Sequence, residues 1–149
     1  MNKYDEIRNL IATSDAVDFA DYGDGVSDAW IARAEERLVF TLPASYKWWL
    51  RHYGGGEIHG EEIFSIYEQD FDTVVGGDIV YHYELNKLDA QYGEMMAVIC
   101  ETDDDVFYFD ILKRTRDGEL PVYSLHDGEE EYARDFIDFL KKRIVVQVE

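Results

Sequence analysis

Apolar residues recur every three or four positions in five stretches of the chain, and β-forming residues cluster between them. A spacing of this kind lets one face of a helix be buried while the other stays in water. The predicted helices span residues 2–12, 27–38, 43–53, 78–90 and 127–144. Ser27 suits the N-cap of the second helix, because its hydroxyl can accept a hydrogen bond from an orphan backbone N–H.

The stretch 42–67 is the one around which we expect the chain to be organised, and it predicts a helix, a glycine hinge and a strand. Pro43 suits the first helical turn, since it lacks an N–H and has a fixed φ. Gly54 stands where helices often end in a left-handed residue, and Gly55 and Gly56 allow a sharp turn. The residues after the hinge favour a strand, with a bulge or bend at Gly60.

Later in the chain, two β-rich runs, 96–101 and 106–111, flank a short acidic loop and predict a hairpin. Residues 120–125 predict a third strand. Such runs imply a largely antiparallel sheet with helices packed around it, which is an α+β fold. The length of 149 residues predicts one domain over residues 1–149, with a core from about 27 to 144.

The last helix is predicted to open within 127–131 and to end at Ile144. Its acidic residues would lie near the N-terminus and Lys141, Lys142 and Arg143 near the C-terminus, which favours the helix dipole. In the fourth predicted helix, Leu88 is expected to point inward.

The chain shows no sign of export or membrane insertion. No apolar run approaches the roughly 20 residues that span a bilayer, and the charged N-terminus lacks the apolar region of a signal peptide. Cys100 is the only cysteine, so an internal disulfide framework is excluded, and its strand-like surroundings favour a buried thiol. These features together predict a cytoplasmic protein.

The strongest compositional feature of the chain is its excess of acidic residues. The chain has 33 acidic and 14 basic residues, a net charge of −19. Direct binding to a nucleic-acid backbone requires the opposite sign. An acidic surface instead suits a basic protein partner, because long-range attraction speeds association. The alternative is that the acidity only keeps the protein soluble.

Three segments carry a family resemblance: Leu-Pro-Ala-Ser-Tyr-Lys-Trp-Trp-Leu, then Tyr-Gly-Gly-Gly-Glu-Ile, then Gly-Glu-Glu-Ile-Phe-Ser-Ile-Tyr. They resemble the SUKH superfamily in its Smi/Knr-type branch, and the resemblance extends over about residues 27–144. It implies an immunity protein of a bacterial polymorphic toxin system, which binds and blocks a toxin domain, very often a nuclease. Other members are regulatory interaction domains. The motif residues with an architectural role are Pro43, Tyr46, Trp49, Gly54, Gly55 and Gly56.

The resemblance does not locate the partner surface, so the candidates come from charge and predicted loops. The acidic candidates are Glu57, Glu61, Glu62, Asp70, Asp72, Asp103, Asp104 and Asp105. Trp48 is an aromatic candidate, since adjacent Trp48 and Trp49 cannot both lie on one narrow helical stripe. The alternative for Trp48 is packing under the N-terminal segment.

Signals for catalysis are weak. The phosphate-loop, dinucleotide and EF-hand patterns are absent, the histidines lack zinc spacing, and no cofactor or metal is expected. Alternation along one strand would place Glu57, His59 and Glu61 on one face and Glu62 on the other.

We therefore expect a binding protein that makes and breaks no bond. A regulatory scaffold for a non-toxin partner is the alternative, and a metal-dependent hydrolase using Glu57, His59 and Glu61 is the third hypothesis. No feature of the sequence fixes the oligomeric state.

Overall fold

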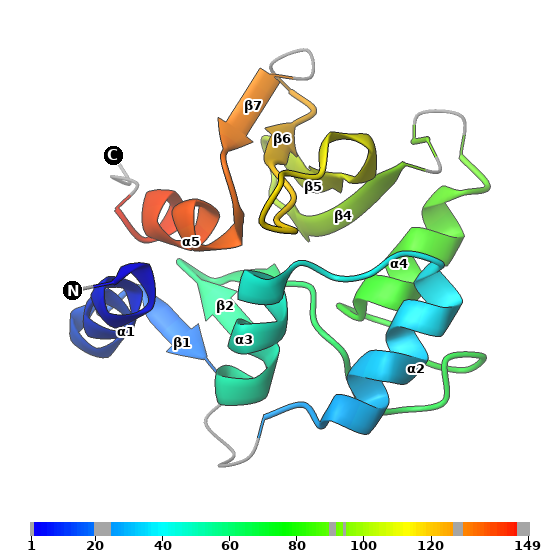
Figure 1. The fold of residues 1–149 in the computed structure, drawn as a ribbon, viewed down its shortest axis with the longest axis horizontal. Coiled ribbons are helices and arrows are strands. Elements are labelled where there is room, and N and C mark those ends of the chain that lie inside the picture. The colour runs from blue at the N-terminus through cyan, green and yellow to red at the C-terminus, as the bar shows by residue number, and fades with distance from the viewer. Residues whose placement is uncertain (1, 20–24, 90–91, 94, 127–129, 146–149) are drawn as a thin grey trace.

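One antiparallel sheet, with strands in chain order from β1 to β7, forms the centre of the computed structural model (Figure 1). The structure describes residues 2–19, 25–89, 92–93, 95–126 and 130–145. The strands in this part of the chain are β1 (Val17–Phe19), β2 (Gly56–Ile58), β3 (Glu61–Ile63), β4 (Met96–Glu101), β5 (Val106–Asp110), β6 (Val122–Ser124) and β7 (Glu130–Ala133). The helices are α1 (Lys3–Thr13), α2 (Asp28–Leu38), α3 (Ala44–Tyr53), α4 (Ile79–Asn86) and α5 (Phe136–Ile144), with a 3₁₀ turn at Ile111–Lys113. The predicted α+β class and antiparallel sheet are confirmed.

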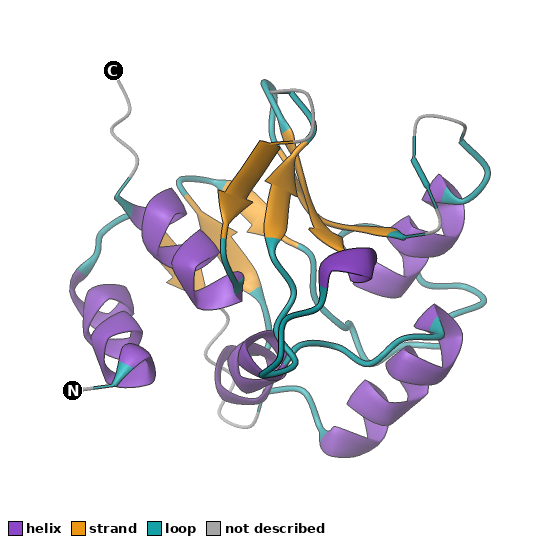
Figure 2. Cartoon of the chain, turned by 45° about the horizontal axis from the view of Figure 1, so that its top comes forward, coloured by secondary structure: helices purple, strands orange, loops and turns teal. Residues whose placement is uncertain are grey.

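The helices pack in two groups (Figures 1 and 2). α1 packs on α5, which also contacts α3, whereas α2 packs on α4 and α4 packs on β4. Neighbouring residues of β4 point to opposite faces of the sheet. Of these, Cys100 lies near Arg143 of α5, and the Glu101 carboxylate lies 4.0 Å from the His82 ring of α4. The two groups of helices therefore cover different faces of the sheet.

The core is built around the aromatic side chains of α3. The Tyr46 ring centroid lies 5.0–5.8 Å from the rings of Trp49, Phe109 and Phe136. The Tyr46 hydroxyl is fully buried and donates a 2.6 Å hydrogen bond to the backbone carbonyl of Phe64. This bond joins α3 to the chain that leaves β3.

The N-terminus of α3 is held by a buried carboxylate. Pro43 is the N-cap with an extended backbone, so the helix begins one residue later than predicted. Both the backbone N–H and the hydroxyl of Ser45 donate to Glu119, which is only 4% exposed. A carboxylate here satisfies orphan N–H groups and opposes the positive end of the helix dipole.

The predicted helix boundaries at Ser27 and Gly54 are confirmed. The Ser27 hydroxyl accepts from the Trp30 N–H and caps α2. Gly54 ends α3 in the left-handed region with φ 77°, and its N–H donates to the Leu50 carbonyl. These boundaries depend on local chemistry, which is why the sequence alone located them.

The prediction of one strand after the glycine hinge is wrong. The chain forms a β2–β3 hairpin in which His59 (φ 52°) and Gly60 (φ 79°) make the turn. A two-residue hairpin turn of type I′ requires positive φ at both positions, which glycine adopts readily and histidine less so. The turn reverses the chain and changes which side chains share a face of the sheet.

The predicted start of the last helix is also wrong. Residues 130–133 form β7 and pair with β6, and α5 starts at Phe136. The Asp135 carboxylate caps it by accepting from the Asp138 N–H. Pairing with the neighbouring strand β6 is a tertiary interaction that overrides the local helical pattern. Residues 127–129 of the predicted helix lie outside the described residues.

Two smaller features of the structure differ from the predictions. α4 ends at Asn86, so Leu88 lies beyond the helix and is 87% exposed instead of buried; Ala90, its predicted end, lies outside the described residues. β1 was not predicted, because its three residues are too few for a clear pattern.

Cys100 is buried as expected, and burial raises the pKa of its thiol to about 12. Among the described helices, none has the length and apolar character needed to cross a bilayer.

Replacing Tyr46 with phenylalanine should lower the free energy of unfolding by about 2 kcal/mol, because the Phe64 carbonyl would lose its buried donor. Urea unfolding followed by tryptophan fluorescence measures this difference. Tyr4→Phe is the control, since the Tyr4 hydroxyl has no hydrogen-bond partner among the described residues. Equal stability of the two variants would contradict a structural role for the Tyr46 hydroxyl.

Candidate functional site

Three carboxylates stand side by side across the first three strands. Asp18 of β1 is the register partner of Glu57 of β2, and Glu57 is the partner of Glu62 of β3. Residues directly opposite one another in antiparallel strands point to the same face. Asp18 and Glu62 are exposed and Glu57 is half-buried.

The row continues onto β4. Ile63 pairs with Cys100, so the antiparallel register places Glu62 beside Glu101. Both residues line the same cavity. We call Asp18, Glu57, Glu62 and Glu101 the carboxylate row.

A cleft of about 600 Å³ opens at the end of this row, between the β2–β3 turn and the β4–β5 turn. Glu61 and Glu62 line it from one turn, and Asp103 and Asp104 from the other. We call this the acidic cleft. Four of the predicted partner-binding residues, distant in sequence, thus meet at one place.

The acidic cleft contains little compensating charge. Arg143 of α5 also lines it, but its guanidinium is paired with the Glu61 carboxylate at 2.6 Å. Within the described part of the chain, Glu57, Glu62, Asp103 and Asp104 form no ion pair. Like charges placed opposite one another destabilise a sheet. The arrangement is therefore suited to a cation supplied from outside.

Glu62 is held in position by Tyr67. The Tyr67 hydroxyl donates to the Glu62 carboxylate at 2.5 Å and accepts from the Gly77 N–H at 2.7 Å. Burial, followed by this bond to Glu62, raises the pKa of Tyr67 to about 12. Glu62 thus keeps a fixed orientation while its charge stays unpaired.

Three acidic candidates lie elsewhere. Asp105 accepts hydrogen bonds from the Val106 and His126 N–H groups and the Ser124 hydroxyl, so it stabilises the base of its hairpin. Asp70 accepts from the Asp72 N–H within its own loop.

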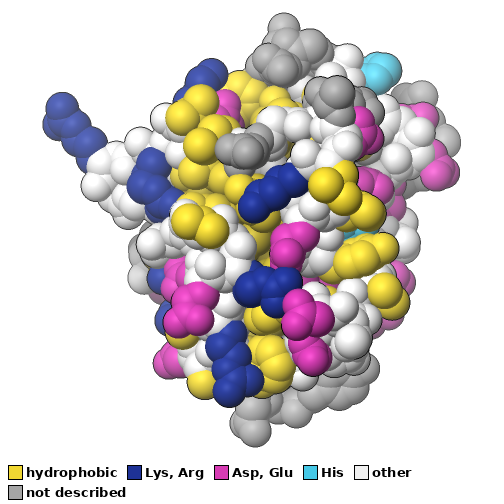
Figure 3. All heavy atoms as spheres, turned by 90° about the vertical axis from the view of Figure 1, so that its right-hand side faces the viewer, with side chains coloured by type: hydrophobic (Ala, Val, Ile, Leu, Met, Phe, Trp, Pro, Cys, Tyr) yellow, Lys and Arg dark blue, Asp and Glu magenta, His cyan; other side chains and the backbone are white. Residues whose placement is uncertain are grey.

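Asp72 lies 3.2 Å from Arg37, which also pairs with Glu84 at 2.8 Å. Figure 3 shows the side of the molecule that α2 and α4 form, where basic side chains lie among the acidic ones. Charge is therefore partly balanced on that side, in contrast to the carboxylate row.

Trp48 lies half-buried under α1. Its ring is 4.9 Å from that of Tyr4, and the Arg8 guanidinium lies 5.5 Å from its ring centroid. This position agrees with the packing alternative. Trp49 is fully buried in the core, as predicted.

The expectation that Glu57, His59 and Glu61 share one face is wrong. The turn at His59 and Gly60 reverses the chain, so Glu57 lies opposite Glu62 and Glu61 lies opposite Ile58. The His59 ring lies 3.3 Å from the Ile144 carbonyl, and Glu61 is paired with Arg143. The three side chains proposed for a hydrolase therefore do not converge.

Two members of the carboxylate row, Asp18 and Glu101, were not among the predicted candidates. Asp18 alternates with the apolar Val17 and Phe19, a pattern that could have indicated a strand with one acidic face. Glu101 ends β4 and could be placed only after the pairing of β3 with β4 was known.

A comparison with protein-family models finds a match over most of the chain. The SUKH_6 model, described as SMI1-KNR4 cell-wall, matches residues 28–140. The chain belongs to the SUKH superfamily, as its motifs predicted. The matched span runs from the start of α2 into α5 and includes the acidic cleft residues of both turns, whereas α1 and Asp18 precede it.

Replacing Glu57 with glutamine should raise the free energy of unfolding by about 0.5 kcal/mol, because it removes repulsion from Asp18 and Glu62 on either side. The gain should shrink at high salt, where charges are screened. Urea unfolding at about 20 mM and about 500 mM NaCl measures both effects. Glu36→Gln, on the exposed side of α2, controls for the change in net charge.

The raised pKa of Tyr67 predicts a loss of stability at alkaline pH. The folded state disfavours the ionised phenol, so its contribution is fully present below about pH 10 and is lost between about 10 and 12. Tyr67→Phe should lack this dependence. Urea unfolding from about pH 8 to about pH 11 measures the stability difference between wild type and Tyr67→Phe. This difference should stay constant up to about pH 10 and decline above it.

Proposed function

We propose that this protein is a bacterial immunity protein that binds a toxin domain with a basic surface and blocks it. Its membership in the SUKH superfamily, which is immunity-protein-like, supports this role. The observation that carries the proposal is the carboxylate row together with the acidic cleft. Glu57, Glu62, Asp103 and Asp104 form no ion pair among the described residues, and the net charge of the chain is −19.

The proposed mechanism is occlusion. A nuclease presents a basic surface to the phosphates of its substrate, and carboxylates at matching positions compete for that surface. Long-range attraction accelerates encounter, while the bound protein excludes the substrate by its bulk. No covalent bond is made or broken in this mechanism, so the protein acts as a binding partner and not as an enzyme, and we place its action in the cytoplasm.

A regulatory scaffold is the second candidate, and the words "cell-wall" in the description of the matching family favour it. A scaffold would bind a cytoplasmic partner that is not a toxin. The two functions differ in what the partner does when it is free, because only a toxin domain would harm the cell that lacks this protein.

The first test is a pull-down with this protein as bait from cells that encode it, followed by mass spectrometry and a nuclease assay. We expect recovery of a large secreted protein with a basic C-terminal domain, and loss of that domain's nuclease activity when the bait is added. Recovery of only housekeeping proteins would contradict the immunity function and favour the scaffold.

Charge-neutralising variants then test the surface. The triple variant Glu57→Gln, Glu62→Gln, Asp103→Asn should associate with the toxin domain about tenfold more slowly at low salt, with the difference vanishing at high salt. The control variant removes the same number of negative charges at exposed sites elsewhere: Glu6→Gln, Glu36→Gln and Glu131→Gln. Equal slowing in both triple variants would mean that only the net charge of the protein matters.

A further inference from the structure

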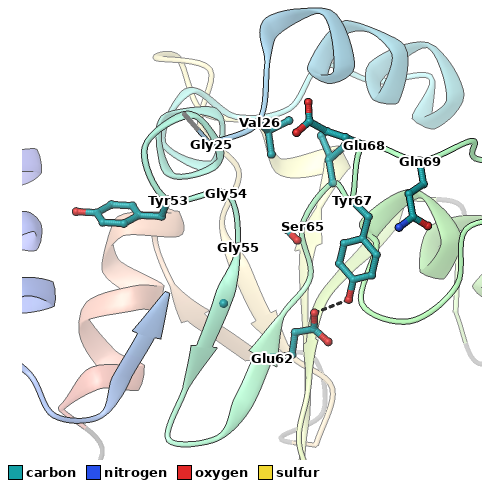
Figure 4. Close-up of a pocket in the computed structure, with 12 residues that line it drawn as sticks. Gly25, Val26, Tyr53, Gly54, Gly55, Glu62, Ser65, Tyr67, Glu68 and Gln69 are labelled. Carbon is teal, nitrogen blue, oxygen red and sulfur yellow. Dashed lines mark hydrogen bonds between the residues drawn. The ribbon is translucent and has the colours of Figure 1, made fainter. Parts of the chain in front are cut away.

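A second cavity adjoins the carboxylate row, on the far side of Glu62 from the acidic cleft. It measures about 550 Å³ and lies between the glycine-rich end of α3 and the segment 65–69 (Figure 4). Glu62 lines both this cavity and the acidic cleft. The two hollows therefore share one carboxylate.

The hydroxyl of a buried serine lines this cavity. Ser65 is 3% exposed, and its backbone N–H and carbonyl are bonded to Gly77 and Ile79. Its side-chain hydroxyl, in contrast, has no hydrogen-bond partner among the residues that the structure describes. A hydroxyl that lines a cavity and is not bonded within the protein is available to a ligand that enters the cavity.

Gly55 packs closely against this serine. A Cβ at Gly55 would lie 2.8 Å from the Ser65 Oγ, and the φ of 143° also disfavours any other residue. Figure 4 shows Gly55 and Ser65 facing each other from the two segments that flank the cavity. The glycine therefore lets the two segments that flank the cavity approach each other closely.

Among the described residues that line the cavity, both charged side chains are acidic. Glu62 and Glu68 line it, and within the described residues neither forms an ion pair. The Tyr67 ring, which holds Glu62 through its hydroxyl, and the apolar Val26 form further parts of the wall. The cavity thus offers two carboxylates, a hydroxyl acceptor, an aromatic ring and an apolar surface.

We propose that this cavity binds an arginine side chain from a surface loop of the toxin. A guanidinium has several N–H donors in a fixed plane, stacks on aromatic rings and is always charged, which matches acceptors arranged around a tyrosine. The volume exceeds that of one side chain and leaves room for neighbouring residues of the loop. That the arginine belongs to a toxin rests on the proposed function, whereas the preference of the cavity for a guanidinium does not.

The first experiment uses a peptide and needs no toxin. The ¹⁵N-labelled protein is titrated with the capped peptide acetyl-Gly-Arg-Gly-amide in physiological salt, and the same peptide with citrulline in place of arginine is the neutral control. We expect saturable shifts of the amide signals of Gly55, Ser65 and Glu68, with the citrulline peptide binding at least about tenfold more weakly. Equal binding of citrulline, or of a lysine peptide, would overturn the guanidinium preference.

Two single variants locate the binding. Ser65→Ala should weaken the arginine peptide about threefold and Glu62→Gln about tenfold. Glu131→Gln, an equal charge change at an exposed residue of β7, should leave binding unchanged, as should Ser14→Ala, a hydroxyl outside the cavity. Native-like amide spectra of each variant confirm that it folds. Unchanged affinity in both cavity variants, or shifts confined to the turns at Gly60 and Asp103, would overturn the proposal.

Failure of this inference can be told apart from failure of the proposed function. If a toxin domain is captured and blocked equally well by wild type, Ser65→Ala and Glu62→Gln, the immunity function stands and the arginine site is wrong. If the arginine peptide binds the cavity but no toxin is found, the guanidinium site stands and the immunity function is wrong.

Discussion

The hydrogen bond from the buried Tyr46 hydroxyl to the Phe64 carbonyl is the constraint on which much of the structure depends. It fixes α3 against the chain that leaves β3, inside a cluster of aromatic rings where an unpaired carbonyl would be costly. Phe64 in turn stacks on the His82 ring at 3.8 Å, which ties the same point to α4. Ser65, the next residue, is thereby held with its hydroxyl toward the cavity beside Gly55.

With this hydrogen bond in place, one sheet both packs on the aromatic core and carries the row of carboxylates. On one face of the sheet, α3 and α5 bury an aromatic core, and on the other face α4 covers β4. Across β1, β2 and β3, the register places three carboxylates side by side, an arrangement that destabilises the fold. Burial of the aromatic core offsets this cost, because each large aromatic side chain contributes far more than one exposed charge pair subtracts. Unfavourable charge placement that is tolerated in this way is typical of binding surfaces.

Glu62 connects the parts of the proposed binding surface. It is a member of the carboxylate row, it lines the acidic cleft, and it lines the cavity that contains the Ser65 hydroxyl. Tyr67 fixes its orientation without neutralising it. A basic partner would thus meet a broad electrostatic surface that speeds encounter and a defined cavity that selects a side chain.

The sequence by itself determined the α+β class, the start of α2, the end of α3, the β4–β5 hairpin and the family, because caps, glycines and alternation act between residues close in the chain. It also determined the acidity and named Glu61, Glu62, Asp103 and Asp104. Only the tertiary structure decided that these four meet in one cleft, that Asp18 and Glu101 join the row, and that residues 130–133 form a strand. Those outcomes depend on strand register between distant segments, where a turn at two residues moves every following side chain to a new position.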